Sequence, residues 1–174
     1  MPDHILVHLN TVKPLGPFSI DAPETRIFTE HLPAVFADAD QDEGMRWHNH
    51  GARTHDGRYL SLEEVVSLKT TGEQNPHIIT MAAWNSLRAM HSFTHRMPNH
   101  VDGMKRLRHW VDRSEGATMV MWWDTPGRRI LLEEGWNKLL KLRADGPTPE
   151  AFTLQHRFDP PSADTSGPAI KGVA

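Results

Sequence analysis

The 174-residue sequence contains no cysteine, which excludes disulfide bonds, thiolate metal sites and a cysteine nucleophile. It has no excess of positive charge either, because 19 Lys and Arg stand against 22 Asp and Glu, and a net charge of -3 provides no basic field for nucleic acid or anionic lipid. No apolar run approaches the roughly 20 residues of a membrane helix, and the first residues lack the pattern of a signal peptide. We expect a cytoplasmic protein that binds neither nucleic acid nor membranes.

Nucleotide-binding and hydrolase motifs are absent as well. The sequence has no Walker loop, no Gly-x-Gly-x-x-Gly after a strand pattern and no Gly-x-Ser-x-Gly elbow, which argues against a dehydrogenase or a hydrolase. What it does have is 12 histidines and 6 tryptophans, beside a single tyrosine. The hydrophobic content of 38% is ordinary for a globular protein, and the length suits one domain.

Hydrophobic spacing predicts an alternation of strands and helices. Strands are predicted around residues 4–9, 45–48, 78–84, 118–123 and 152–154, and helices at 25–40, 87–111 and 132–145. Pro33 is expected to kink or split the first helix, and Pro98 to break the second, which begins after a cap at Asn85-Ser86.

The composition also marks the limits of the domain. Residues 51–76 are rich in Gly, Thr and charge, and we interpret them as a long excursion between strands with at most one short helix. Excursions of this length inside a compact domain are often lids or binding loops. We expect one domain over residues 1–159 and a poorly ordered, Pro- and Ser-rich tail over 160–174.

Two strand–helix–strand units in this order predict a ferredoxin-like α+β fold, a split βαβ sandwich with an antiparallel sheet and helices on one face. The segment 118–123, Thr-Met-Val-Met-Trp-Trp, is apolar on both sides and is expected to be a central strand. The bare face then needs a second sheet, most simply that of another subunit, which predicts a homodimer. The alternative is a monomer in which residues 51–76 fold over the sheet.

Three sequence features together resemble one known family. The first is the pattern Trp-x-Ser-Leu-x-x-(apolar)-x-x-Phe-x-x-Arg from Trp84 to Arg96, and the second is His100, ten residues before Trp110. The third runs from Trp122-Trp123 through Pro126-Gly127 to Gly146-Pro-Thr-Pro-Glu-Ala-Phe-Thr153. Over residues 78–155 this set resembles the domain-of-unknown-function 3291 family, in the dimeric α/β-barrel superfamily of antibiotic-biosynthesis monooxygenases.

The resemblance implies a dimeric α/β barrel in which each copy encloses a pocket for an apolar small molecule. Relatives in the superfamily include cofactor-independent oxygenases, haem-binding and haem-degrading enzymes, and isomerases or cyclases. The sequence departs from the family in having His95 where a Tyr is expected, one residue inserted near Pro98-Asn99 and a longer excursion at 51–76. These departures indicate a specialised member, from a biosynthetic pathway.

The histidines of the broken helix are the candidate catalytic residues. His91 and His95 are four residues apart and share a helical face, and His100 follows the proline break. Because an unperturbed imidazole titrates near pH ~6.5, a histidine in a pocket can act as a general base or ligate haem iron. His100 is the first candidate, since its spacing to Trp110 matches the family, and His95 is the second. For each histidine the alternative is an exposed surface position.

Aromatic walls suit a planar ligand, and large apolar pockets with a few polar groups are the usual binding sites. The candidate substrate-binding residues are Trp47, Trp84, Arg96, Trp122, Trp123 and Met81. Trp122 and Trp123 are adjacent in a strand and must face opposite ways. Arg96 can anchor a carboxylate or a phenolate. The alternatives are packing in the core or an interface for the apolar residues, and a surface ion pair for Arg96.

A second group of histidines provides weak candidates for a metal site. His48 and His50 lie two apart in a strand pattern and so share one face, and His55 is near enough in sequence to add a third ligand. Their spacing matches no familiar metal motif. A polar strand end that enters a loop is the favoured interpretation, and we expect no metal.

The favoured function is a small-molecule enzyme that acts on a hydrophobic aromatic or polycyclic metabolite by histidine-assisted proton transfer. The outcome is either cofactor-independent oxygenation or isomerisation and cyclisation, which need the same base, orientation and dry cavity. No cofactor is expected, and haem with a histidine axial ligand is the second choice. A non-catalytic binder of an apolar ligand is the third.

Overall fold

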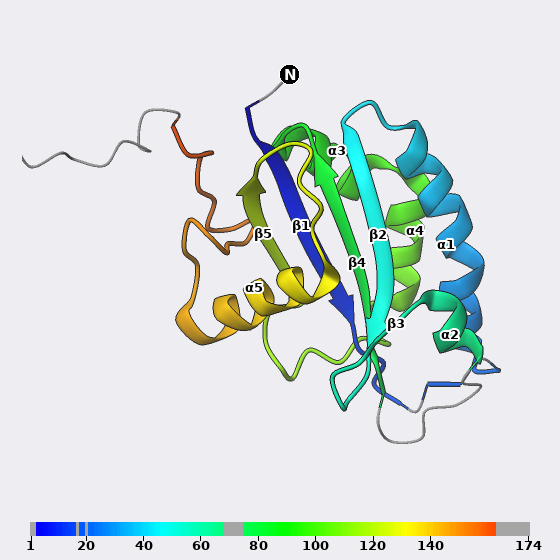
Figure 1. The fold of residues 1–174 in the computed structure, drawn as a ribbon. Helices are drawn as coiled ribbons and strands as arrows, with labels where there is room; N and C mark the ends of the chain where they lie inside the picture. The colour runs from blue at the N-terminus through cyan, green and yellow to red at the C-terminus, as the bar shows by residue number, and fades with distance from the viewer. Residues whose placement is uncertain (1–2, 17, 20, 68–74, 163–174) are drawn as a thin grey trace, which may run out of the picture.

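A computed structural model describes residues 3–16, 18–19, 21–67 and 75–162 of the chain (Figure 1). The strands are β1 (Ile5–Val12), β2 (Met45–Arg53), β3 (Tyr59–Leu60), β4 (His77–Trp84) and β5 (Met119–Asp124). The helices are α1 (Pro23–Gln41), α2 (Leu62–Ser67), α3 (Leu87–Arg96), α4 (Pro98–Leu107) and α5 (Leu132–Asp145). Within these described ranges, no helix combines the length and the apolar character that crossing a membrane requires.

The strands form one antiparallel sheet in the order β3-β2-β4-β1-β5. The helix α1 connects β1 to β2, and the pair α3 and α4 connects β4 to β5. The two βαβ units are β1-α1-β2 and β4-α3-α4-β5. In the sheet, β4 lies between the two strands of the first unit and β1 lies between the two strands of the second, which is the split βαβ arrangement. The predicted ferredoxin-like α+β fold is confirmed.

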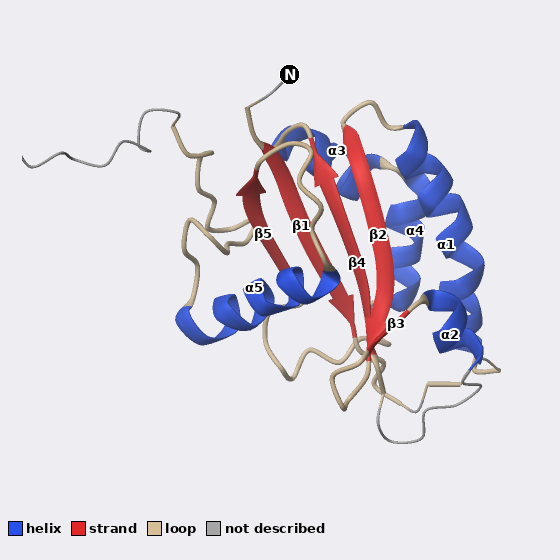
Figure 2. Ribbon diagram, viewed as in Figure 1, coloured by secondary structure: helices blue, strands red, loops and turns tan. Residues whose placement is uncertain are grey.

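Helices cover both faces of the sheet, and the prediction that they lie on one face is wrong (Figure 2). On one face lie α1, α3 and α4, and α5 crosses the other. Side chains alternate along β1, so that Val7 and Leu9 pack toward α5 while Leu6 and His8 face the other three helices. The periodicity of α5 identifies the helix correctly, but it carries no information about which face the helix covers.

The strand β5 is the clearest correction to the predicted topology. It lies at an edge of the sheet, not at its centre. It is apolar on both sides because both sides are covered within the same chain: Trp122 packs in the α5 core, and Met121 packs with Phe93 and Phe152 on the other face. Burial of β5 therefore does not require the sheet of a second subunit.

The C-terminal segment protects the outer edge of β5. The backbone of Phe152 exchanges two hydrogen bonds with that of Met121, at 2.9 and 2.8 Å. The predicted strand at 152–154 is reduced to this single bridge. It follows Gly146, whose positive φ of 77° ends α5 as glycine commonly does. Of the predicted tail, residues 163–174 lie outside the described residues.

The helix boundaries agree closely with those that local chemistry predicts. Ser86 is the N-cap of α3, with its hydroxyl accepting a hydrogen bond from the Ala89 N–H at 3.1 Å. Pro98 ends α3 and begins α4, while α1 runs as one helix through Pro33. The excursion predicted at 51–76 contains the end of β2, then β3 and the short α2, and its residues 68–74 lie outside the described residues.

Candidate functional site

A pocket of about 220 Å³ lies between the sheet and the helices α1, α3 and α4. Its floor is the helix-facing side of β1, β4 and β5, where the small Ala82 leaves space above the sheet. Most of its lining is apolar, and its polar side chains come from the strands, from α1, α3 and α4, and from the segment between α4 and β5. The polar and aromatic residues on which the site depends are His8, Asn10, Thr80, Trp84, Phe93 and His100.

A row of packed rings joins the two histidines of this pocket. The rings of His8 and Trp84 stack with their centroids 6.0 Å apart, Trp84 meets Phe93 at 5.0 Å, and Phe93 meets His100 at 5.5 Å. Trp84 is fully buried and Phe93 nearly so. Both belong to the motif that runs from Trp84 to Arg96. The motif therefore forms the rigid aromatic wall that holds the imidazoles in place.

His8 is fixed by its partner in one protonation form. The indole Nε1–H of Trp84 donates a hydrogen bond of 2.9 Å to Nδ1 of His8. An indole N–H can only donate, so Nδ1 carries no proton and the neutral ring holds its proton on Nε2. Burial, and then repulsion from His100, lower the pKa of His8 to about 4. At neutral pH His8 therefore presents an Nε2–H donor, for which the described residues provide no acceptor.

His100 is fixed in the opposite form. Its Nδ1 lies 2.9 Å from the carbonyl oxygen of Thr94, which can only accept, so Nδ1 carries the proton and Nε2 carries the lone pair. Burial lowers the pKa of His100, the hydrogen bond to Thr94 opposes this effect, and repulsion from His95 adds to it. The Nε2 atom has no partner among the described residues. His100 is thus placed to accept a proton from a molecule in the pocket.

The break at Pro98 explains why Thr94 is available to His100. In a continuous helix the carbonyl of residue 94 would accept a hydrogen bond from the N–H of residue 98, which proline lacks. Neighbouring helical bonds persist, from Met97 N–H to the Phe93 carbonyl at 3.2 Å and from Val101 N–H to the Met97 carbonyl at 3.0 Å. Pro98 therefore frees the Thr94 carbonyl, and His100 uses it as an anchor.

The structure brings His100 and Trp84 to the pocket, and it places the other predicted residues of the broken helix elsewhere. His95 and Arg96 are exposed at the end of α3 and are not among the residues that line the pocket. The ring of His95 packs against that of His91, at 4.4 Å between centroids, on the outer side of the helix.

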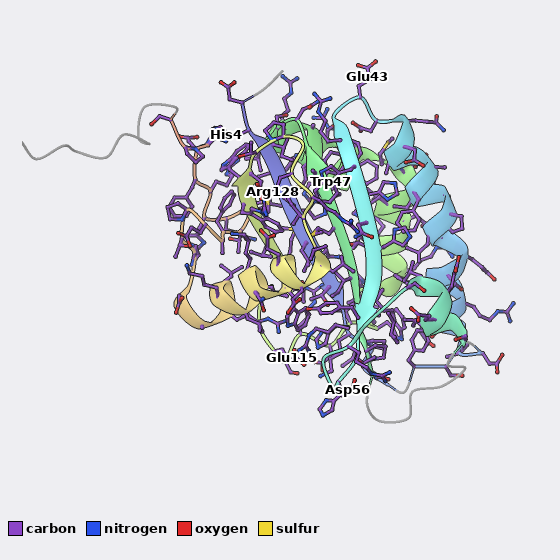
Figure 3. All side chains as sticks on the ribbon, in the orientation of Figure 1. His4, Glu43, Trp47, Asp56, Glu115 and Arg128 are labelled. Carbon is purple, nitrogen blue, oxygen red and sulfur yellow. The ribbon has the colours of Figure 1, made fainter. Side chains whose placement is uncertain are left out.

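Three of the predicted substrate-binding residues pack on the α5 face, which is the opposite side of the sheet from the pocket. Trp47 and Trp122 belong to the α5 core, and Figure 3 labels Trp47 on β2. Met81 touches the pocket through its position in β4, but its side chain is buried against Gly135 of α5. Trp123 is on the pocket side of the sheet but beyond the pocket, where its Nε1–H donates to the Phe158 carbonyl at 2.7 Å.

The histidines of β2 form an aromatic stack with Phe36. His48 and His50 share one face of the strand, as predicted, and both stack on Phe36 of α1 at 5.3 and 4.3 Å. Nε2 of His48 lies 2.9 Å from Asp40. His55 is exposed in the turn between β2 and β3. Among the described residues, no group of three or more His, Cys, Asp or Glu side chains is placed to hold a metal ion.

The floor of the pocket also carries His8 and Asn10, two apart in β1, which are not among the site residues that the sequence predicts. The described residues offer no hydrogen-bond partner to the side-chain amide of Asn10. The signal was present, because both are polar residues on one face of a strand whose other face carries the apolar Ile5, Val7 and Leu9 beside them. A polar pair on an inward-facing strand is unexpected in a core and therefore marks a cavity.

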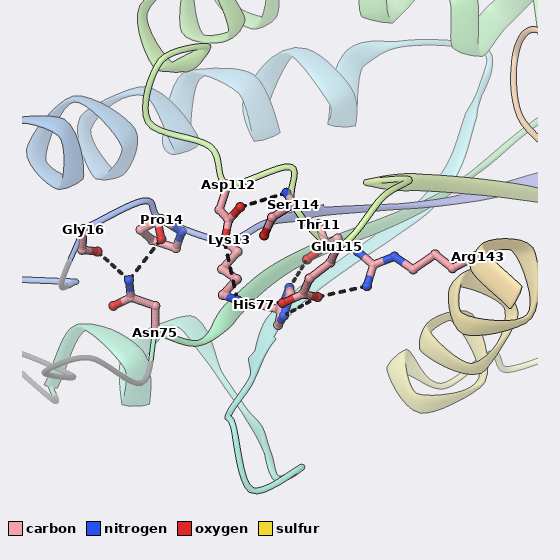
Figure 4. A network of polar contacts seen from close by, with 10 residues as sticks. All are labelled: Thr11, Lys13, Pro14, Gly16, Asn75, His77, Asp112, Ser114, Glu115 and Arg143. Carbon is pink, nitrogen blue, oxygen red and sulfur yellow. Dashed lines mark hydrogen bonds and ion pairs between the residues drawn. The ribbon is translucent and has the colours of Figure 1, made fainter.

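A second polar cluster lies at the far end of β1 and β4 (Figure 4). The hydroxyl of Thr11 is 3.3 Å from Nδ1 of His77, and Nε2 of His77 is 3.3 Å from a carboxylate oxygen of Glu115. Lys13 and Arg143 also contact Glu115, at 2.6 and 3.0 Å. The order of hydroxyl, imidazole and carboxylate is that of a catalytic triad, but Thr11 is only 2% exposed. This cluster ties the loop before β5 to the sheet and to α5.

Comparison with known proteins gives a family and several distant structural neighbours. A family model described as "Domain of unknown function (DUF3291)" matches residues 6–168, and no curated protein matches the chain. The fold resembles that of a dimeric ferredoxin-like protein of unknown function from Jannaschia sp. CCS1, with 16% identity over 69% of this chain and 97% of that one, at a TM-score of 0.44.

Other neighbours have a stated activity. SnoaB, a cofactor-independent oxygenase from Streptomyces nogalater, is 15% identical over 75% of this chain and 99% of its own, at a TM-score of 0.41. A monooxygenase from Streptomyces coelicolor in complex with nanaomycin D is 12% identical over 74% of this chain and 91% of its own, at a TM-score of 0.38. Likeness of this extent carries no argument about activity.

Proposed function

This chain belongs to the family described as domain of unknown function 3291, and from its pocket we propose that it is an enzyme of small-molecule biosynthesis that works by proton transfer. His100 is the general base, and His8 donates a hydrogen bond to the oxygen on which negative charge develops. The observation that carries the proposal is that two imidazoles of opposite, fixed tautomer line one pocket.

The chemistry follows from these two forms. A substrate with an acidic C–H or O–H next to a carbonyl or on an aromatic ring gives up its proton to Nε2 of His100. The resulting enolate or phenolate oxygen is stabilised by the Nε2–H of His8, whose neutral ring needs no reorganisation during the reaction. The carbanion so formed reacts with O2 in an oxygenase or is reprotonated elsewhere in an isomerase or cyclase. Both outcomes share the first step.

The volume of the pocket limits the size of the substrate. A cavity of about 150 Å³ holds one benzene molecule, and this pocket measures about 220 Å³. It therefore suits a compound of one or two rings, which narrows the sequence-based expectation of an aromatic or polycyclic metabolite. The wall formed by Trp84 and Phe93 provides the flat apolar surface against which such rings pack.

The proposal is tested with 2-tetralone, a two-ring ketone whose protons next to the carbonyl exchange slowly with solvent deuterium. Exchange is followed by mass spectrometry, with O2 uptake measured in parallel to separate oxygenation from isomerisation. His100→Asn keeps a donor for the Thr94 carbonyl but lacks the distal base, and His8→Asn keeps an acceptor for Trp84 but lacks the distal donor. Each is expected to slow exchange by about 10²-fold or more.

His8→Gln is the matched control, because its amide restores an N–H near the position of Nε2. Partial recovery of exchange in this variant, with none in His8→Asn, supports the role of His8 as a donor. If the wild-type protein binds 2-tetralone but gives no exchange above the rate in buffer, the protein is a non-catalytic binder of an apolar ligand. Exchange that survives His100→Asn at the wild-type rate contradicts the assignment of the base.

The haem alternative does not fit the pocket. His100 presents the right kind of atom for an axial ligand. However, a pocket of about 220 Å³ exceeds the volume that holds a single benzene by only about half, whereas a haem joins four pyrrole rings in one plane. No step of the proposed reaction runs through haem, and a Soret band in the purified protein would contradict this conclusion.

The homodimer stays a prediction. The described residues place α5, not a second sheet, over the face that β5 and β1 present away from the pocket. A dimer would therefore have to pair through the outer side of α5, where Leu131 and Leu140 are exposed, or through a sheet edge. Light scattering on the purified protein distinguishes one copy from two.

A further inference from the structure

The ionisable residues that line the pocket are all basic, among the residues that the structure describes. They are His8, His31, His48, His100, Arg108 and Arg113. No Asp or Glu of the described chain takes part in the lining, although acidic residues outnumber Lys and Arg in the sequence by 22 to 19. The exclusion of carboxylates is therefore a local property of this pocket and not a reflection of composition.

The two arginines, like His8 and His100 but unlike His31 and His48, have no carboxylate partner in the described chain. His31 is paired with Asp102 at 3.0 Å, and His48 with Asp40 at 2.9 Å. Arg108 donates through Nε to the neighbouring His109, and no ion pair or hydrogen bond engages the side chain of Arg113 within the described residues.

Arg108 and Arg113 are exposed at the rim, whereas His8 and His100 lie inside. Arg108 follows α4, and Arg113 lies in the loop between α4 and β5. Beside them the rim is formed by Met104, Val111 and Met119, which are apolar. A guanidinium on such a rim keeps its charge in water while its fork faces an incoming group, and planar forks of this kind bind carboxylates and phosphates in bidentate fashion.

We infer that the substrate carries an anionic group, a carboxylate or a phosphate, which Arg108 and Arg113 bind at the rim while its ring system reaches inward to His8 and His100. This inference rests on the proposed function and adds the class of substrate: a one- or two-ring aromatic acid or aryl phosphate. The absence of a lining carboxylate removes the repulsion that such a ligand would otherwise meet.

The test compares 2-naphthoate and 2-naphthyl phosphate with the neutral 2-naphthamide by calorimetric titration. Wild type should bind one of the anions about tenfold more tightly than the amide, a difference of ~1.4 kcal/mol. The double variant Arg108→Gln/Arg113→Gln should lose this preference for an anion and should bind the amide as tightly as wild type does. Arg129→Gln, an exposed arginine outside the lining, should preserve it and so exclude an effect of net charge.

Competition with neutral 2-tetralone separates failure of this inference from failure of the proposed function, and it needs no mutation. Displacement of the probes by 2-tetralone shows that they occupy the pocket. If 2-naphthamide then binds as tightly as both anions, or if the double variant still prefers an anion to the amide, the anion site is refuted and the proposed function is not affected. Loss of the preference in Arg129→Gln also overturns the anion site. If 2-tetralone neither competes nor exchanges, the proposed function itself fails.

Discussion

Replacing His8 by Asn should change the pH dependence of stability in a defined window. An unfolded chain protonates this imidazole near its ordinary pKa of 6.5, whereas in the folded protein the pKa is about 4. Between these values the unfolded chain binds a proton that the folded one excludes, so stability rises with pH. The contribution of the neutral ring is complete above pH 6.5 and is lost as the pH falls to 4.

The magnitude follows from the same two pKa values. One pKa unit corresponds to about 1.4 kcal/mol, so a fall from 6.5 to about 4 corresponds to about 3 kcal/mol of unfolding free energy. His8 can carry so large an effect because it is enclosed by protein except where its ring faces the pocket. His8→Asn removes the titration but keeps a side-chain oxygen that can accept from Trp84.

Urea unfolding of both proteins across this pH range is the assay. The difference in unfolding free energy, wild type minus His8→Asn, should grow by about 3 kcal/mol from the acid to the neutral end. Taking the difference cancels the titration of other buried histidines such as His50 and His77, whose pKa values burial also lowers. His156→Asn, at an exposed position, controls for the loss of an imidazole as such. A difference that stays constant with pH would refute the reasoning.

Three further predictions concern single contacts. Trp84→Phe removes the donor that keeps Nδ1 of His8 unprotonated, so an NMR titration should find the pKa of His8 raised above about 4. Ser86→Ala removes the N-cap of α3 and should lower the free energy of unfolding by about 1 kcal/mol in urea, while activity per folded molecule is retained. Gly135→Ala places a Cβ 2.8 Å from a Leu9 methyl and should cost about 1–3 kcal/mol. Gly103→Ala, where the nearest atom is 3.7 Å from the added Cβ, should instead raise the free energy of unfolding by up to ~1 kcal/mol. If thermal unfolding shows the same effect for both alanine variants, the packing described for α5 is contradicted.

The elements that the sequence predicts well are those that local chemistry specifies. The strands at β1 and β4, the cap at Ser86 and the break at Pro98 each follow from a few neighbouring residues. The position of β5 does not, because a strand that is apolar on both sides reports that both faces are buried and not what buries them. Here α5 and the segment around Phe152 take the place that a second subunit was expected to fill.

The candidate site was predictable in part for the same reason. On α3 the buried face is set by Met90 and Phe93, and at 100° per residue His95 points about 200° away from Phe93, toward solvent. This angle alone predicts that His95 lies outside the pocket. His100 reaches the pocket because Pro98 starts a new helix, which is a matter of tertiary geometry. His8 joins it through strand pairing that brings β1 beside β4.

The partners of the two histidines matter more to the account than their presence in the pocket. Trp84 and Thr94 give the imidazoles different tasks, one as donor and one as acceptor, although the side chains are chemically the same. Neither partner can exchange its role, because an indole N–H never accepts and a carbonyl never donates. The difference between the two histidines is therefore built into the fold.

Long-range ¹H–¹⁵N correlation spectra of histidine-labelled protein at neutral pH read this arrangement directly. We predict a His8 ring that is protonated on Nε2 alone and a His100 ring that is protonated on Nδ1 alone. Identical tautomers in the two rings, or a doubly protonated His100, would contradict it.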